Sequence, residues 1–106
     1  MRDLMGIMKK AQEMQAKMAE VQAALEQTPV DGSAGGGAVV VRLNGKGDML
    51  HVEIDPELLK PDEREIVQDL VVAAHNEARR KVETIAAEKM QEVTAGLPLP
   101  PGMKLF

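Results

Sequence analysis

The sequence predicts an α+β fold in one domain: a long N-terminal helix, a small antiparallel β-sheet and a long C-terminal helix. Two long stretches with the apolar spacing of helices flank one stretch in which apolar and polar residues alternate, as they do in strands. The chain has 106 residues, enough for a single domain with a modest core. Both helices are longer than such a domain is wide, so we expect a homodimer with protruding helical arms.

The first helix is predicted over residues 2–27, before the turn signals at Pro29 and Gly32. Its apolar residues recur at alternating spacings of three and four, which is the seam of a coiled coil over about three heptads. A helix of roughly 39 Å is too long for a small globule, and we expect its seam to pack on a second copy of the chain. The seam residues, our candidates for the dimer interface, are Leu4, Ile7, Ala11, Met14, Met18, Val21 and Leu25.

The sheet is predicted within residues 28–55, with a β-hairpin over residues 38–55. Pairing Asn44 with Met49 across a four-residue loop, Gly45 to Asp48, aligns the apolar faces of both strands. The aligned pairs are Leu43 with Leu50, Val41 with Val52 and Val39 with Ile54. On the polar face, Arg42 is expected to pair with Glu53. A third strand near residues 28–34 has a weaker signal, because proline and glycine are disfavoured within strands.

A short helical turn at residues 56–60 and a long helix at residues 62–94 are predicted to follow the sheet. Asp55 before a proline is a typical start for the turn. Asp62 and Glu65 resemble a capping box at the start of the long helix, which extends about 50 Å. The tail at residues 95–106 contains three prolines and cannot continue the helix.

The glycine-rich stretch at residues 35–47 superficially resembles a phosphate-binding loop. A P-loop lies between a strand and a helix and ends in Gly-Lys-Ser or Gly-Lys-Thr, whereas Lys46 is followed by Gly47 and then by a strand. We therefore interpret the glycines as turn residues. His51 and His75 lack neighbours at metal-ligand spacing, and the chain has no cysteine. We predict no catalytic residue, no cofactor, no metal site and no small-molecule substrate, and therefore no enzyme.

The charge distribution restricts the ways in which the chain could bind nucleic acid. The net charge is −4 and there is one aromatic residue, so binding must use local basic clusters and not base stacking. Lysine and arginine in such clusters contact phosphates without reading sequence. The alternative is that they form exposed helical ion pairs with Glu13, Glu77 and Glu83. The candidate DNA-binding residues are Lys9, Lys10, Lys17, Arg79, Arg80 and Lys81.

Four stretches, in this order, resemble a known family: KKAQEMQAKMAEVQ, MLHVEIDPELL, EIVQDLVVAAHNEARRKVE and GLPLPPGMKLF. The chain is similar over nearly its whole length to the YbaB/EbfC family of bacterial nucleoid-associated proteins. The resemblance implies a tweezer-shaped homodimer that binds double-stranded DNA with little sequence preference and influences nucleoid organisation and gene expression. It also implies no cofactor. Family DNA contacts are attributed to the helical arms, which here carry the six basic candidates.

Two functions from different classes are therefore expected. The first is a dimeric DNA-binding protein in the cytoplasm, associated with the nucleoid, since the sequence shows neither a membrane span nor a signal-peptide stretch. The alternative is a protein–protein interaction or adaptor module that uses methionine-rich helical seams without DNA. The eight methionines and the net charge of −4 favour this alternative.

Overall fold

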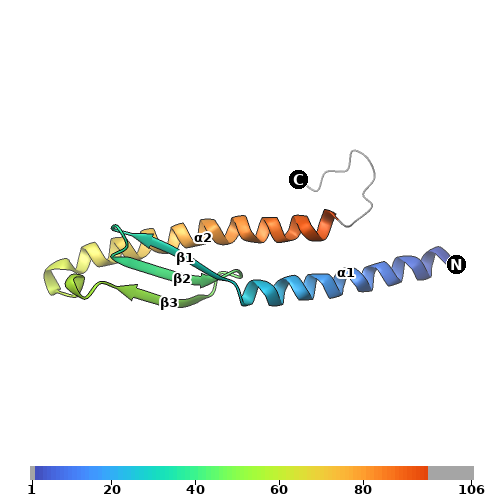
Figure 1. Ribbon diagram of the computed structural model, residues 1–106, viewed down its shortest axis with the longest axis horizontal. Coiled ribbons are helices and arrows are strands. Elements are labelled where there is room, and N and C mark those ends of the chain that lie inside the picture. Colours follow the sequence, from blue (N-terminus) through green and yellow to red (C-terminus); the bar gives the residue numbers. More distant parts are fainter. Residues whose placement is uncertain (1, 96–106) are drawn as a thin grey trace.

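The computed structural model describes residues 2–95 and confirms the α+β fold. Helix α1 spans Arg2–Glu26, the strands are β1 (Pro29–Ala34), β2 (Val39–Asn44) and β3 (Met49–Ile54), and helix α2 spans Arg64–Ala95 (Figure 1). Residues 96–106 of the predicted tail (95–106) lie outside the described residues, and Ala95 is the last residue of α2. The molecule is elongated, with extents of 72 × 26 × 15 Å. Its radius of gyration of 20.0 Å exceeds the roughly 13 Å of a compact domain of this size.

The sheet has three antiparallel strands in the order β1-β2-β3, so the weakly indicated third strand is present. Gly35, Gly36 and Gly37 connect β1 to β2 and have φ values of +66°, +68° and +94°. This left-handed region is disfavoured for residues with a Cβ atom, so glycine is the residue that this turn requires. These glycines therefore form a hairpin turn.

The register between β2 and β3 corrects one part of the sequence prediction. Val39 lies opposite Ile54 and Val41 opposite Val52, as predicted, but Leu43 faces Met49 instead of Leu50. The loop is shorter than expected, because the Asn44 N–H donates to the Asp48 carbonyl at 2.8 Å. The Gly47 N–H donates to the Asn44 carbonyl oxygen, and Gly47 has a φ of +93°. Both features are typical of a three-residue hairpin loop. The shorter loop leaves Leu50 as the extra residue of a bulge, with 54% of its surface exposed.

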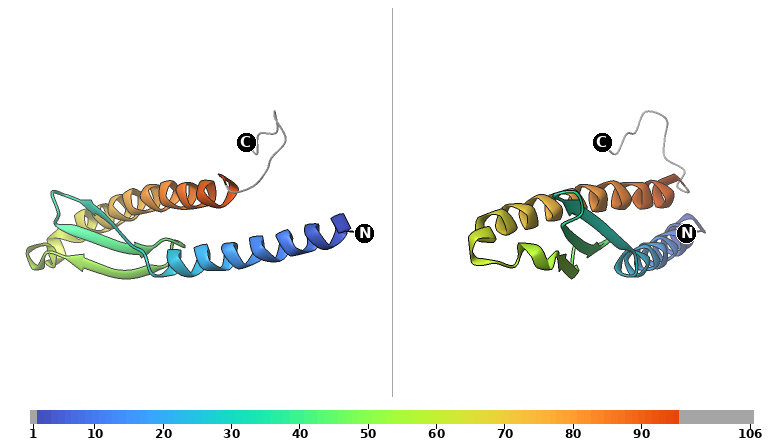
Figure 2. Two further views of the ribbon diagram at one scale, coloured as in Figure 1. Left: turned by 45° about the vertical axis from the view of Figure 1, so that its right-hand side comes forward. Right: turned by 60° about the vertical axis from the view of Figure 1, so that its left-hand side comes forward.

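The core lies between α2 and the inner face of β1 and β2, and Figures 1 and 2 show α2 along one side of the sheet. Val39, Val41 and Leu43 are buried, and they pack in one cluster with Ala74 and Ala78. Small residues let the helix approach the sheet closely. At the crossing with β1, a Cβ atom on Gly32 would collide with the Ala74 carbonyl oxygen and the Ala78 nitrogen.

The entry to α2 differs from the predicted capping box. Asp55 caps a one-turn 3₁₀ helix, Pro56–Leu58, by accepting a hydrogen bond from the Glu57 N–H at 2.9 Å, as predicted. A second 3₁₀ turn, Pro61–Glu63, then leads into α2 at Arg64. Asp62 is therefore inside this turn and does not occupy the cap position, because Pro61 fixes φ at the first position of the turn.

The ion pair of Arg42 also differs from its prediction. Arg42 binds both carboxylate oxygens of Asp31, with Nε–Oδ1 at 2.8 Å and Nη2–Oδ2 at 3.2 Å. Asp31 lies directly opposite Arg42 in the β1–β2 register, whereas Glu53 is diagonal to it across β3. Directly opposite side chains are closer than diagonal ones. Strand β1, which pairs with β2, therefore supplies the partner of Arg42.

Candidate nucleic-acid interface

Three of the predicted DNA-binding residues lie on α1, with Lys9 and Lys10 in its outer half and Lys17 further in. Lys9, Lys10 and Lys17 are exposed, and within residues 2–95 none of them forms an ion pair. Figure 1 shows α1 leading away from the sheet toward the N-terminus. The whole of α1 is an arm attached to the sheet at its inner end, and its residues 3–13 are all exposed to solvent. An unpaired ammonium group on such an arm can meet a phosphate without first breaking an ion pair.

The α1 seam is buried only near the sheet. Leu25 is 6% exposed, and Met14, Met18 and Val21 are half-buried. Further out, Leu4 and Ile7 are 62% and 64% exposed, and Ala11 is exposed too. The inner half of the seam therefore packs within the chain, while its outer half presents apolar side chains to solvent.

The basic run on α2 divides into residues with different surroundings. Arg79 forms an i,i+4 ion pair with Glu83 at 3.7 Å, with both side chains 68% exposed. Exposed pairs of this kind contribute about 0–1 kcal/mol, and a phosphate can replace the carboxylate. Arg80 is exposed and has no ion pair in the described part of the chain. Both arginines therefore stay available for phosphate contact.

Lys81 forms the helical ion pair with Glu77 that was the alternative prediction, and it has a second, structural partner that the sequence did not predict. Its ammonium group donates to the Asp31 carbonyl oxygen at 2.9 Å and pairs with Glu77 at 3.3 Å, and Glu77 accepts from the Ser33 N–H at 3.3 Å. These bonds occupy backbone groups on the outer edge of β1. An unpaired strand edge is a site for unwanted strand addition, so Lys81 and Glu77 protect the edge.

The surrounding carboxylates are held in their ionised form. The backbone N–H of Ser33 and then Lys81 lower the pKa of Glu77, while the hydrogen bond from Arg42 lowers the pKa of Asp31. Asp31 in turn raises the pKa of Arg42. Carboxylates stabilised as anions by fixed partners are structural and poorly suited to proton transfer near neutral pH.

The described residues show no other chemical centre. No group of three or more His, Cys, Asp or Glu within residues 2–95 is arranged to hold a metal ion. In the same residues, neither helix combines the length and apolar character needed to cross a membrane.

One apolar surface was not anticipated from the sequence. The contacts of α2 with the sheet are concentrated on β1 and β2, so the inner face of β3 is largely uncovered beyond the half-buried Ile54. Val52 lies opposite the buried Val41, yet it is 40% exposed, and Met49 is 51% exposed. Alternation in the hairpin predicted that Val52 faces the core, whereas Met49 was expected on the polar face and reaches the inner face only through the bulge at Leu50. The sequence also did not predict that one helix is too narrow to cover three strands.

Comparison with known proteins places this arrangement in a family. The sequence matches the YbaB/EbfC DNA-binding family over residues 1–97. The chain belongs to this family. A nucleoid-associated protein of Granulibacter bethesdensis is 59% identical, over 99% of this chain and 98% of that protein. A nucleoid-associated protein of Rhizobium meliloti is 56% identical over the same shares of the two chains.

A solved structure of an uncharacterized protein from Helicobacter pylori has the same fold. Its TM-score is 0.70 at 25% identity, and the match covers 88% of this chain and 94% of that one. YbaB/EbfC proteins are a DNA-binding family, and the named relatives are nucleoid-associated proteins and not enzymes, as the sequence predicted. In this YbaB/EbfC chain the six basic candidates occupy two helices, with three on the α1 arm and three on α2 beside β1.

Proposed function

We propose that the chain binds double-stranded DNA as a homodimer, largely through backbone phosphates and with little sequence preference. In this role it associates with the nucleoid and influences nucleoid organisation and gene expression. The observation that carries the proposal is the set of three exposed lysines on α1, none of which has a carboxylate partner in the described residues. The names of the relatives, which call them nucleoid-associated, support it.

The spacing of the lysines suits a phosphate backbone. Lys9 to Lys17 spans about 12 Å along the helix axis, which is the rise of three to four nucleotides along one strand. Lysine acts as a point charge toward phosphate, and contacts of this kind carry no sequence information. Arg79 and Arg80 provide a second, separate contact region on α2. This arrangement favours contact with the backbone over recognition of a sequence.

A second copy of the chain is the natural cover for the inner face of β3. Val52 and Met49 continue the buried face of the sheet beyond the edge of α2, and exposed apolar surface of this kind favours association. A dimer also doubles every basic group that faces DNA. The outer part of the α1 seam, from Leu4 to Ala11, stays a second candidate for the dimer interface.

The test is a matched pair of charge reversals. In Lys10→Glu/Lys17→Glu the two changes lie on the arm, and in the control Lys60→Glu/Arg64→Glu they lie at the opposite end of the molecule, with an equal change in net charge. We expect the arm variant to bind unrelated duplexes less tightly, and to lose about 0.9 from the log–log salt slope for each phosphate contact removed. The control should keep most of its affinity in fluorescence anisotropy titrations. Equal losses in both variants would show that the arm is not the contact surface.

The adaptor function is favoured by a different observation. Four apolar side chains at the end of α1 are 58–76% exposed, namely Leu4, Met5, Ile7 and Met8. These residues can dock on a protein partner as an amphipathic helix does in a groove. Failure of the intact dimer to bind any duplex at physiological salt would favour the adaptor function over DNA binding.

A further inference from the structure

The turn between β2 and β3 holds the end of the α1 arm. The Gly45 N–H donates to the Leu25 carbonyl oxygen at 2.7 Å, and this oxygen also accepts from the Thr28 N–H at 3.2 Å. The last four carbonyls of a helix have no partner inside the helix. The backbone amide of Gly45 in the turn therefore caps α1 and fixes the helix end to the turn.

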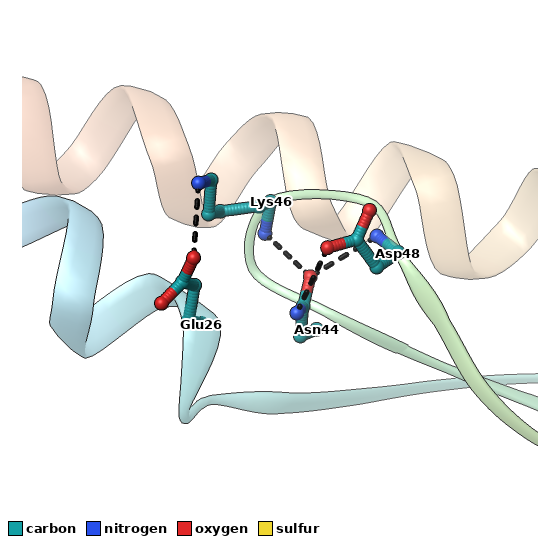
Figure 3. Close-up of polar contacts among 4 residues, drawn as sticks. All are labelled: Glu26, Asn44, Lys46 and Asp48. Carbon is teal, nitrogen blue, oxygen red and sulfur yellow. Dashed lines mark hydrogen bonds and ion pairs between the residues drawn. The ribbon is translucent and has the colours of Figure 1, made fainter.

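A charge pair adds to this attachment, as Figure 3 shows. The Lys46 ammonium lies 3.1 Å from the Glu26 carboxylate, with side chains 38% and 51% exposed. The last turn of α1 contains no basic residue of its own. Lys46 thus supplies the positive charge that a helix C-terminus favours.

The turn itself is rigid enough to orient the helix. Asn44 is 5% exposed, and its Oδ1 atom accepts from the N–H groups of Lys46 and Asp48, each at 3.0 Å (Figure 3). The Asn44 N–H donates to the Asp48 carbonyl at 2.8 Å. A loop with its polar groups bonded internally moves as one body with the two strands, and so transmits their orientation to α1.

Gly45 has no side chain at the point where the turn meets the helix. A Cβ atom there would lie 2.8 Å from the Leu25 carbonyl oxygen and 3.0 Å from its Cα atom. These are backbone atoms, which cannot rotate aside as a side chain can. Gly45 is needed for this close approach and not for an unusual φ angle.

Small changes at this joint are amplified along the arm. Lys9 is 16 residues from Leu25, a distance of about 24 Å along the helix, so a tilt of about 10° moves the lysine by about 4 Å. That exceeds the 3.4 Å rise between successive nucleotides of one strand. Residues 3–13 are exposed, so their direction depends on how the inner end of α1 is held.

We propose that the β2–β3 turn is a positioning element for DNA binding, in which Gly45 and Lys46 set the direction of the α1 arm. They do not contact DNA; they place Lys9, Lys10 and Lys17 where a duplex can meet them. The role in DNA binding rests on the proposed function, whereas the control of arm direction is independent of it.

The first test compares Gly45→Ala with Gly6→Ala. Both add one methyl group without changing charge, and a Cβ atom at Gly6 would have no neighbour within 4 Å. The chain contains no cysteine, so Glu13→Cys and Glu88→Cys give unique sites for spin labels on α1 and α2. Labelled protein is mixed with excess unlabelled protein, so that each dimer holds one labelled copy, and circular dichroism confirms folding.

We expect Gly45→Ala to change the distance between the labels, and Gly6→Ala to leave it unchanged. Affinity of Gly45→Ala for a random-sequence duplex should fall at least about tenfold, with a shallower salt slope, because misplaced lysines lose phosphate contacts. A purely structural effect of Gly45 would lower thermal stability alone and leave both readouts unchanged well below the unfolding temperature.

The second test uses the charge pair and does not depend on the fate of Gly45→Ala. Lys46→Glu places two carboxylates together at the end of α1 and should shift the label distance and weaken DNA binding. The swap Glu26→Lys/Lys46→Glu restores opposite charges at the wild-type net charge. We expect the swap to recover most of the wild-type distance and affinity.

The outcomes separate this inference from the proposed function. Unchanged label distances in both Gly45→Ala and Lys46→Glu would overturn the positioning role, as would shifted distances with wild-type affinity. Failure of the unsubstituted protein to bind any duplex would overturn the proposed function and the role of the turn in DNA binding. In that case a shifted distance in Gly45→Ala would still establish that the turn directs the arm.

Discussion

At the scale of single residues, the closest contact between helix and sheet depends on a missing side chain. Gly32 lies on β1 against Ala74 and Ala78 of α2, and a Cβ atom at this position would collide with the helix backbone. We expect Gly32→Ala to lower the free energy of unfolding by about 3 kcal/mol, since overpacking of a tight core costs about 1–3 kcal/mol and backbone cannot yield. Urea denaturation followed by circular dichroism measures the change. Gly6→Ala is the control, and a similar effect there would refute the packing argument.

A second residue-level prediction concerns acid. The pKa values of Asp31 and Glu77 are lowered in the folded chain by Arg42 and by the Ser33 N–H respectively, from ordinary values of 3.8 and 4.5. The stability that these groups contribute is present above their unfolded pKa values and is lost as pH falls through the folded ones. We therefore expect the unfolding temperature to decrease when the pH is lowered beneath about 4. Asp31→Asn and Glu77→Gln should each flatten this fall, and an unaltered profile in both would contradict the assignment.

At the scale of elements, periodicity predicted both helices and the hairpin because those signals repeat over many residues. The bulge at Leu50 could not be predicted, since it depends on a difference of one residue in the loop after Asn44. Strand β1 was only weakly predicted, because it contains a proline and a glycine. The bonds that Lys81 and Glu77 make to its edge come from α2, which is distant in the sequence. Such bonds between distant segments leave no periodic signal in the sequence.

The candidate site shows the same division. The three lysines of α1 could be predicted to lie outside the apolar seam, because the seam spacing places Lys10 and Lys17 at positions beside it. The attachment of α1 to the turn could not be predicted. In the sequence, Gly45 and Lys46 resemble ordinary turn residues, and only the fold places them beside Leu25 and Glu26. In the same way, the bidentate pairing of Arg42 with Asp31 required the third strand to be in place.

At the scale of the whole molecule, the net charge is acidic, so DNA binding depends on where the positive side chains lie. A chain with a net charge of −4 attracts DNA only where its positive groups are separated from its carboxylates. The elongated shape separates the lysines of α1 from the acidic residues of the sheet and of the turn before α2. Glu13 and Glu20 lie on α1 itself, but within residues 2–95 neither forms an ion pair with these lysines. In the proposed dimer, two copies joined at their sheets would bring two such arms to one duplex, and affinity would then depend on association.

The last prediction tests where the two copies meet. Val52→Asp places a carboxylate on the uncovered inner face of β3, while the control His51→Asp adds a carboxylate to the opposite face of the same strand. Each buried carboxylate should cost at least about 1.4 kcal/mol, and two per dimer weaken association about 100-fold. Light scattering should then show a monomer for Val52→Asp and a dimer for His51→Asp. The monomeric variant should bind DNA more weakly than the dimeric one. If Val52→Asp stays dimeric while Ile7→Asp dissociates, the interface lies on the α1 seam instead.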